Sequence, residues 1–186
     1  MIVCKYKFDS NIYSNLIPEF NSGYNGYSVN DVADGNIITR TIECDTLPTL
    51  MRFGQAWANG EAQQDYTRCL LEVLDINTSE LTSCHSMFRH CINLTSINCN
   101  WNTSNVADMK DMFSTCNNLT QLDLSNFDTS SVTNMGYMFY GCTNLTQLDV
   151  SNFNTSNVTD MYAMFYNCSN LTQLDVSNFN TSNVTN

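Results

Sequence analysis

The second part of the chain repeats one pattern of hydrophobic and polar positions. Equivalent leucines occur in steps of 23, 25, 26 and 26 residues, at Leu71, Leu94, Leu119, Leu145 and Leu171. The last two copies are almost identical, because segment 144–159 recurs letter for letter as segment 170–185. A fixed period in this range is typical of stacked structural repeats, in which each unit covers the apolar face of its neighbour. The pattern therefore predicts a solenoid.

Each repeat is predicted to contain a short helix followed by a short strand. The apolar side chains of one repeat are spaced 3, 3, 1, 3 and 3 residues apart, at Val158, Met161, Met164, Phe165, Cys168 and Leu171. This spacing fits one face of a helix, and Thr155 or Ser156 is in position to cap its first turn. Leu174, Asp175 and Val176 then alternate as in a strand. We therefore expect an α/β solenoid of the leucine-rich-repeat type, with one short strand and one short helix in each 23–26 residue repeat.

Residues 1–66 lack the repeat and hold both prolines and most of the glycines. The segment 33–36, Ala-Asp-Gly-Asn, has the composition of a hairpin turn, and the β-branched segment 37–42 follows it. Weaker strand candidates are 6–8 and 49–53, and 59–65 reads as a polar junction before a first repeat that opens near Leu70. We expect a small β-rich N-terminal anchoring or capping region over 1–66, and a repeat region over 67–186 with about four repeats and a partial one.

The repeat resembles a known family. The string Leu-x-x-Leu-Asp-Val-Ser-x-Phe-x-Thr-Ser-x-Val-Thr-x-Met-x-x-Met-Phe-x-x-Cys, which stands at 145–168 and closely at 119–142, resembles the BspA-like leucine-rich repeat of surface proteins from bacteria, some protists and gut bacteriophages. The resemblance covers about 115 of the 186 residues. It implies extracellular adhesion or binding and supplies neither an active site nor a ligand. The first repeat departs from the string after Ile76, which is typical of a capping unit.

Charge and hydrophobicity exclude two classes of partner. The net charge is −11, and only Arg89 and Lys110 are basic after position 70. Nucleic-acid affinity depends on lysine and arginine displacing counterions, so no nucleic-acid partner is expected. No apolar run approaches the roughly 18 residues of a membrane helix, and no signal peptide is visible, so no membrane insertion is expected.

A polar column is the first candidate binding face. The predicted core uses the apolar positions of each repeat, which leaves a set of acidic and amide side chains on the outer strand face: Asp75, Gln121, Asp123, Gln147, Asp149, Gln173 and Asp175. Neighbouring strands lie about 4.8 Å apart, so these groups would form a column. The column is interpreted either as a partner-binding surface or as a solvated face that keeps the protein soluble. One carboxylate per repeat is sparse for calcium, and no metal or cofactor is expected.

A second candidate surface consists of four tyrosines on the outer side of the predicted helices. These are Tyr137, Tyr140, Tyr162 and Tyr166. Exposed tyrosines supply rigid contact area in binding surfaces. Packing between neighbouring helices is the alternative interpretation.

The cysteines and histidines suggest no catalytic or zinc site. Four cysteines share one inward repeat position, at Cys91, Cys116, Cys142 and Cys168, as stacked buried thiols or as a disulfide ladder. His85 is aligned with Tyr137 and Tyr162, and like His90 it is expected to face outward. No nucleophile elbow or phosphate-binding loop is present, so the chain is not expected to be an enzyme.

Two hypotheses for function follow. The first is a non-enzymatic recognition or adhesion module, displayed on a cell surface, that binds a protein or a glycan through the faces of the solenoid. The alternative is a structural protein of a bacteriophage virion, associated with tail or capsid through residues 1–66, which could itself bind the host receptor. The last repeat is regular up to Asn186. Since solenoids close with an atypical repeat, either more repeats follow or a partner, including a second copy, covers this end.

Overall fold

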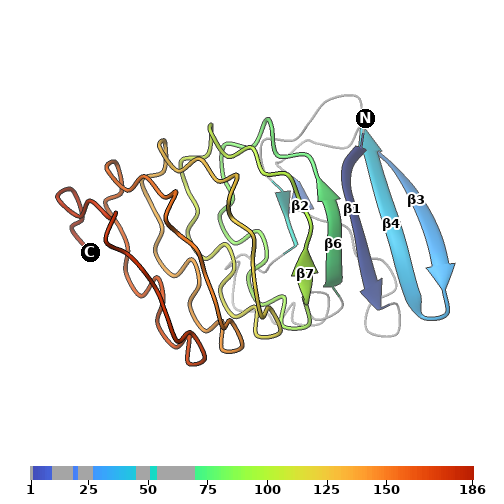
Figure 1. Ribbon diagram of the computed structural model, residues 1–186. Helices are drawn as coiled ribbons and strands as arrows, with labels where there is room; N and C mark the ends of the chain where they lie inside the picture. Colours follow the sequence, from blue (N-terminus) through green and yellow to red (C-terminus); the bar gives the residue numbers. More distant parts are fainter. Residues whose placement is uncertain (1, 10–18, 21–26, 45–50, 54–69) are drawn as a thin grey trace, which may run out of the picture.

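The computed structural model describes most of the chain and places its strands near the N-terminus. The described residues are 2–9, 19–20, 27–44, 51–53 and 70–186. The strands are β1 (Ile2–Asp9), β2 (Glu19–Phe20), β3 (Tyr27–Asp34), β4 (Ile37–Cys44), β5 (Met51–Arg52), β6 (Leu70–Ile76) and β7 (Ser96–Ile97). Figure 1 shows a sheet at the N-terminal end and, beyond β7, a series of backbone turns that continues to the C-terminus.

Five strands form one mixed sheet in the order β3-β4-β1-β6-β7, in which only β6 and β7 pair in parallel. The predicted hairpin is confirmed, because β3 and β4 pair on either side of a turn at Gly35, which has φ of 60°. Segment 6–8 lies in β1, as predicted. Of segment 49–53, β5 covers Met51–Arg52, and residues 49–50 lie outside the described residues, as does the predicted junction 59–65.

The N-terminal sheet runs directly into the first repeat. β1 pairs antiparallel with β6, so that Lys5 lies opposite Asp75. Lys7 also forms an ion pair with Glu72 across these strands, with 2.8 Å between Nζ and Oε2. β6 begins at Leu70, where the first repeat was predicted to open. The predicted boundary between 66 and 67 lies outside the described residues.

Successive repeats lie side by side and are joined through their backbones. The amide of Cys84 donates to the carbonyl of Asp108, and that of Phe88 donates to the carbonyl of Met112, both at 2.9 Å. The same pattern links the following repeats, and isolated parallel bridges connect Ser83, Asp108, Asn134 and Asp160 in order. In these segments the carbonyls of one repeat therefore receive amide hydrogens from the repeat before it.

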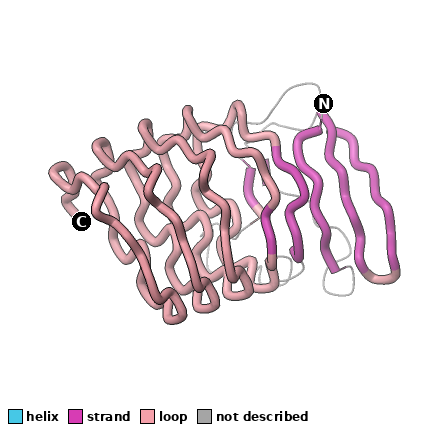
Figure 2. The backbone as a smooth tube through the Cα atoms, viewed as in Figure 1, coloured by secondary structure: helices cyan, strands magenta, loops and turns pink. Residues whose placement is uncertain are grey.

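The predicted helices are wrong, because none of the described residues forms a helix (Figure 2). These segments are successions of tight turns, in which for example the amide of Met138 donates to the carbonyl of Met135. Two residues in each succession have a positive φ, namely Ser86 and His90, Asp111 and Thr115, Tyr137 and Gly141, and Ala163 and Asn167. A left-handed residue interrupts a helix. Alternate amides bond to the neighbouring repeat and the amides between them bond within the turns, so the backbone is satisfied without the i to i−4 bonds of a helix.

The predicted strand and cap also fail in the later repeats. Within the repeats only β6 and β7 are strands among the described residues, and Leu174–Val176 has no strand pairing. Thr155 does not cap a helix. It is buried, donates from its hydroxyl to the carbonyl of Asn180 at 3.1 Å, and accepts from the amide of Asn180 at 2.7 Å. The strand-and-helix unit of a leucine-rich repeat is therefore absent from the described residues.

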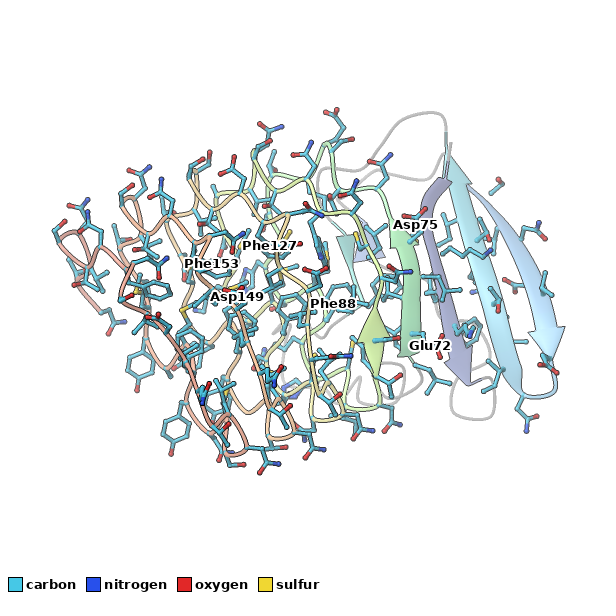
Figure 3. All side chains as sticks on the ribbon, viewed as in Figure 1. Glu72, Asp75, Phe88, Phe127, Asp149 and Phe153 are labelled. Atoms are coloured by element: carbon cyan, nitrogen blue, oxygen red, sulfur yellow. The ribbon has the colours of Figure 1, made fainter. Side chains whose placement is uncertain are left out.

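Aromatic columns fill the core. One column stacks nearly parallel rings at 5.6–5.7 Å between centroids, through Phe53, Phe88, Phe113, Phe139 and Phe165. A second column contains Phe127, Phe153 and Phe179, and Trp101 packs edge-on against Phe127. Figure 3 shows Phe88, Phe127 and Phe153 in the interior of the repeats. Each ring buries its faces against the ring of the next repeat, which ties the packing to the repeat period.

The four repeated cysteines are free thiols, which confirms the first of the two predicted arrangements. The thiols of Cys116, Cys142 and Cys168 donate to the carbonyls of Phe88, Phe113 and Phe139 respectively, each at 3.1 Å. Every one of these carbonyls belongs to the preceding repeat. The cysteine column therefore links repeats through hydrogen bonds and not through disulfides.

Candidate binding groove

A groove of about 440 Å³ crosses three repeats on the side of the predicted polar column. Each repeat contributes a short run of residues to it: Thr95–Ile97, Thr120–Asp123 and Gln147–Asp149. The first run contains β7, which pairs with β6 of the N-terminal sheet. The groove therefore begins where the sheet ends and continues over the turn-linked repeats.

Four residues of the predicted column are brought together here, namely Gln121, Asp123, Gln147 and Asp149. The other three lie elsewhere. Gln173 and Asp175 belong to the last repeat and do not line the groove, and Asp75 lies in β6 opposite Lys5. Figure 3 shows Asp75 on β6, apart from Asp149. The predicted column is thus only partly a single surface.

The groove also has apolar members, which the sequence interpretation missed. Ile97, Leu122 and Leu148 line it, one from each repeat. Leu148 is 8% exposed, and Ile97 and Leu122 are half-buried against the core. These side chains follow the apolar periodicity that was assigned entirely to the interior. The groove therefore offers an apolar strip together with amides, carboxylates and threonine hydroxyls.

The aspartates of the groove have a structural role as well as a charge. Asp123 and Asp149 each accept a hydrogen bond at 2.9 Å from the amide two residues later, of Ser125 and Ser151. These bonds from the serine amide and hydroxyl lower the pKa of both carboxyls. The aspartates close a turn at the groove and stay ionised at neutral pH.

The glutamines of the groove have no such role. Among the described residues, no hydrogen bond satisfies the side-chain amides of Gln121 and Gln147, and both side chains are exposed. Each amide can donate two hydrogen bonds and accept two. The two glutamines are therefore the groove residues whose polar atoms are most available to a ligand.

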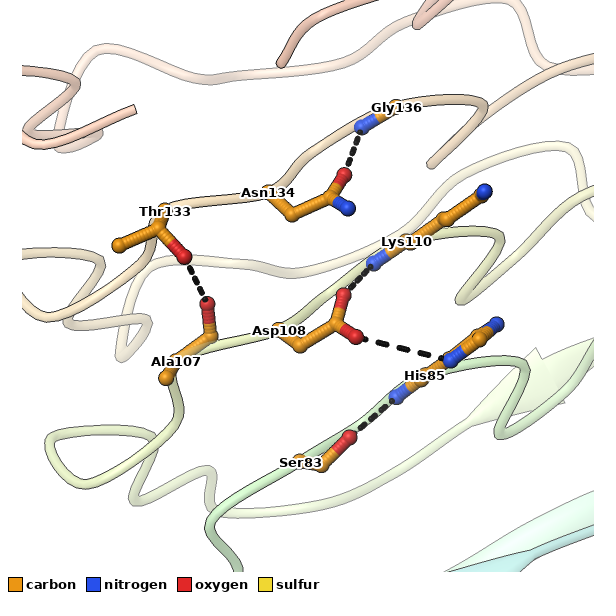
Figure 4. Close-up of polar contacts among 8 residues, drawn as sticks. All are labelled: Ser83, His85, Ala107, Asp108, Lys110, Thr133, Asn134 and Gly136. Atoms are coloured by element: carbon orange, nitrogen blue, oxygen red, sulfur yellow. Dashed lines mark hydrogen bonds and ion pairs between the residues drawn. The ribbon is translucent and has the colours of Figure 1, made fainter. Parts of the chain in front are cut away.

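A second column of turn-closing side chains starts the segments that were predicted to be helical (Figure 4). Asp108 Oδ1 accepts from the amide of Lys110, and Asn134 Oδ1 accepts from the amide of Gly136, both at 2.9 Å. Ser83 does the same for His85, whose Nδ1 lies 3.5 Å from Asp108 Oδ2. The backbone register of these turns corrects the alignment of His85, which is equivalent to Lys110, Gly136 and Tyr162 but not to Tyr137.

The four predicted tyrosines form one cluster, which we call the tyrosine patch: Tyr137, Tyr140, Tyr162 and Tyr166. The rings of Tyr140 and Tyr166 stack with centroids 5.3 Å apart, and those of Tyr137 and Tyr162 are 5.2 Å apart. Tyr162 is 50% exposed and Tyr166 is 63% exposed. Packing between neighbouring repeats is therefore observed, whereas binding by these tyrosines stays a prediction.

Buried charges near the tyrosine patch are paired. Arg89 Nε lies 3.5 Å from Asp111 Oδ1, and both side chains are buried. Burial lowers the pKa of His90, and the positive charge of Arg89 lowers it further. Within the described ranges, no group of three or more histidine, cysteine or acidic side chains is placed to hold a metal ion. In the same ranges, no helix is long and apolar enough to cross a membrane.

Comparison with known proteins gives a family for the repeat region. The family described as "Mycoplasma protein of unknown function, DUF285" matches residues 61–148 and 121–186. No curated protein and no solved structure matches the chain. The two matched segments together span the repeats, the groove and the tyrosine patch. The chain therefore belongs to the DUF285 family, which is related to leucine-rich-repeat-like proteins.

Proposed function

We propose that the protein is a non-enzymatic recognition module whose groove binds an extended glycan or peptide on a cell surface. The observation that carries the proposal is the repetition inside the groove. Equivalent positions of successive repeats supply Thr95 and Thr120, then Gln121 and Gln147, then Asp123 and Asp149. A ligand with its own regular spacing would meet the same polar groups in each repeat.

The chemistry of the groove favours a ligand that is neutral or positively charged. Such a ligand is either a polyhydroxyl compound or a peptide. The two glutamine amides are available for hydrogen bonds, and the two aspartates carry negative charge. The leucine and isoleucine side chains supply a strip on which the apolar side of a sugar or a side chain can pack. An anionic ligand would be repelled.

The proposal extends to architecture and location. We infer that the repeats form a BspA-like solenoid displayed outside the cell, in which the N-terminal sheet covers the first repeat. The pairing of β1 with β6 supports a covering role, because β6 would otherwise present an open strand edge.

The experiment that tests the groove is an array of immobilised glycans and extended peptides probed with the labelled protein. The wild type is compared with the double variant Asp123→Asn/Asp149→Asn. Asparagine keeps the oxygen that closes each turn, as Asn134 shows in its own turn, so the variant removes charge with little effect on the fold. We expect the double variant to bind fewer members of the array than the wild type does, and to lose the cationic peptides first. Identical array profiles for the two proteins would contradict the proposal.

A further inference from the structure

The groove repeats its polar groups at a fixed step from one repeat to the next. The amide of Thr146 donates to the carbonyl of Thr120 at 3.1 Å, and the hydroxyl of Thr146 donates to the same carbonyl at 3.2 Å. Neighbouring backbones joined by hydrogen bonds in this way lie about 4.8 Å apart. Gln121 and Gln147 each follow one of these threonines and line the groove. Their backbone positions therefore recur at this step.

A ligand that lies across the repeats has to match the step of the groove. In an extended peptide, the side chains on one side recur about every 6.7 Å. Over the two steps from the first to the third repeat of the groove, the peptide would fall out of register by about 4 Å. This mismatch is longer than a hydrogen bond. One pyranose ring with its glycosidic oxygen spans close to one step, so a straight chain of sugars stays in register with the repeats.

Most polar atoms of the groove accept hydrogen bonds. Thr95 donates its hydroxyl hydrogen to the carbonyl of Leu71 at 3.0 Å, which leaves the lone pairs of the hydroxyl for a ligand. The carboxylates of Asp123 and Asp149 only accept, and their capacity exceeds the one bond that each accepts from a serine amide. The glutamine amides both donate and accept. A ligand rich in hydroxyl groups supplies the donors that these oxygens need, whereas a peptide backbone supplies one N–H for each residue.

The apolar strip follows the same repetition. Ile97, Leu122 and Leu148 contribute one aliphatic side chain from each of the three repeats. A pyranose ring carries C–H groups on its faces and hydroxyls at its rim. Such a ring can lie on the strip while its rim reaches the threonine, glutamine and aspartate side chains, which is the usual division of apolar and polar contacts in a ligand site.

We propose that the ligand of the groove is a linear glycan of β-1,4-linked pyranose sugars, which lies across the repeats with one sugar on each of the three. The inference rests on the proposed function and selects one of its two ligand classes. The sugar hydroxyls donate to the threonine and aspartate oxygens and exchange hydrogen bonds with the glutamine amides. Because hydroxyls line both edges of such a chain, each repeat meets hydroxyls whichever way its sugar is turned.

The test is a calorimetric titration of the full chain with β-1,4-linked oligosaccharides of increasing length, in separate glucose, N-acetylglucosamine and mannose series. In at least one series the affinity should rise up to three sugars and then level off, because the groove crosses three repeats. The α-1,4-linked glucose series should show no such rise, because this chain coils and leaves a straight groove. An extended peptide of alternating threonine and serine should bind more weakly than the three-sugar chain.

A gain of affinity tests the match of one sugar to each repeat. Ser96 stands in the first repeat where the next two have Gln121 and Gln147, and its side chain is exposed. Ser96→Gln should strengthen binding of the three-sugar chain by about three- to tenfold, since it adds one amide to the groove. The two-sugar chain, which lies on the two glutamine repeats, should stay within about twofold of the wild type. The matched control is Gln173→Ala, outside the groove, which should leave the dependence on length unchanged.

Three results would overturn the glycan assignment. These are no binding in any β-1,4-linked series, an affinity that does not depend on chain length, and a Ser96→Gln variant that fails to favour the three-sugar chain over the two-sugar chain. If peptides bind in place of glycans and Gln121→Ala/Gln147→Ala abolishes that binding, the proposed function stands and the glycan assignment alone is wrong. If neither glycans nor peptides bind, both are wrong.

Discussion

The thiol of Cys116 donates a hydrogen bond to the backbone carbonyl of Phe88 in the preceding repeat, at 3.1 Å. Phe88 in turn stacks on Phe113, with 5.7 Å between ring centroids. The same two residue types therefore contribute a hydrogen bond and a stacked ring to one contact between repeats. This pairing explains why a cysteine and a phenylalanine recur together in each repeat.

The cysteine column should be unreactive in the folded protein. Burial raises the pKa of Cys142 to about 12 and that of Cys116 well above its ordinary value. Only a thiolate is a nucleophile, so at pH 8 about one Cys142 in ten thousand is reactive. Mass spectrometry after iodoacetamide treatment should find both cysteines unmodified in the native protein and modified in urea. Rapid modification under native conditions would contradict this arrangement.

The same pKa shifts make the stability of the folded protein depend on pH in the alkaline range. The folded-state pKa of each buried thiol lies above the unfolded value of about 8.5, so the stabilisation is complete below that value. As the pH rises from about 8.5 toward 12, the unfolded thiols ionise first and the free energy of unfolding falls. Urea titrations at neutral and alkaline pH should show this decrease, and Cys142→Ala should reduce it. An unchanged slope in that variant would assign the decrease to other groups.

Asn152→Asp should destabilise the protein although the two side chains have nearly the same shape. Nδ2 of Asn152 donates at 2.9 Å to the carbonyls of Leu124 and Phe127 in the preceding repeat. A carboxylate cannot donate and would face these oxygens, at a cost of about 1 to 3 kcal/mol. Asn118→Asp is the matched control, because it adds the same charge at an asparagine that is also exposed and whose side chain makes no such bonds among the described residues. Equal midpoints of urea unfolding for the two variants would count against the linking role of Asn152.

Thr129→Val should also weaken the contact between repeats. The buried hydroxyl of Thr129 donates to the carbonyl of Asn154 at 3.0 Å and accepts from the amide of Asn154 at 2.7 Å. Valine leaves two backbone groups unpaired, so we expect a loss of about 1 to 3 kcal/mol in the free energy of unfolding. Thr120→Val, at an exposed threonine, should change it by less than about 0.5 kcal/mol. A Thr129 variant as stable as the Thr120 variant would be inconsistent with the observed bonds.

The sequence was sufficient for the repeat period and for the identity of the core. Met138, Phe139 and Cys142 are buried at the positions that the pattern predicted. The sequence did not predict the backbone conformation of the repeats. Apolar side chains spaced 3, 3 and 1 residues apart fit consecutive tight turns as well as they fit a helix. The left-handed residues that distinguish the two include Asp111 and Tyr137, whose residue types give no glycine signal. Hydrogen bonding to a neighbouring repeat decides between a helix and a succession of turns. The sequence of a single repeat does not reveal that bonding.

The groove was predicted in part for a related reason. The period alone indicated Gln121 and Gln147 as equivalent outer side chains, and the structure brings them into one groove. The period could not show that Leu148, assigned to the interior, reaches the same surface. The role of Asp149 in a turn did have a local signal, because an aspartate two residues before a serine favours this turn.

The groove is tested most directly by comparing two glutamine variants in one binding titration. The probe is the glycan or peptide that gives the strongest array signal with the wild type. Gln121→Ala/Gln147→Ala removes the available amides of the groove, whereas Gln173→Ala removes the equivalent amide from a repeat that does not line it. We predict at least about tenfold weaker binding for the first variant, since two ligand hydrogen bonds are lost, and unchanged binding for the second. Equal affinity of wild type and both variants would contradict the assignment of the groove as the binding site.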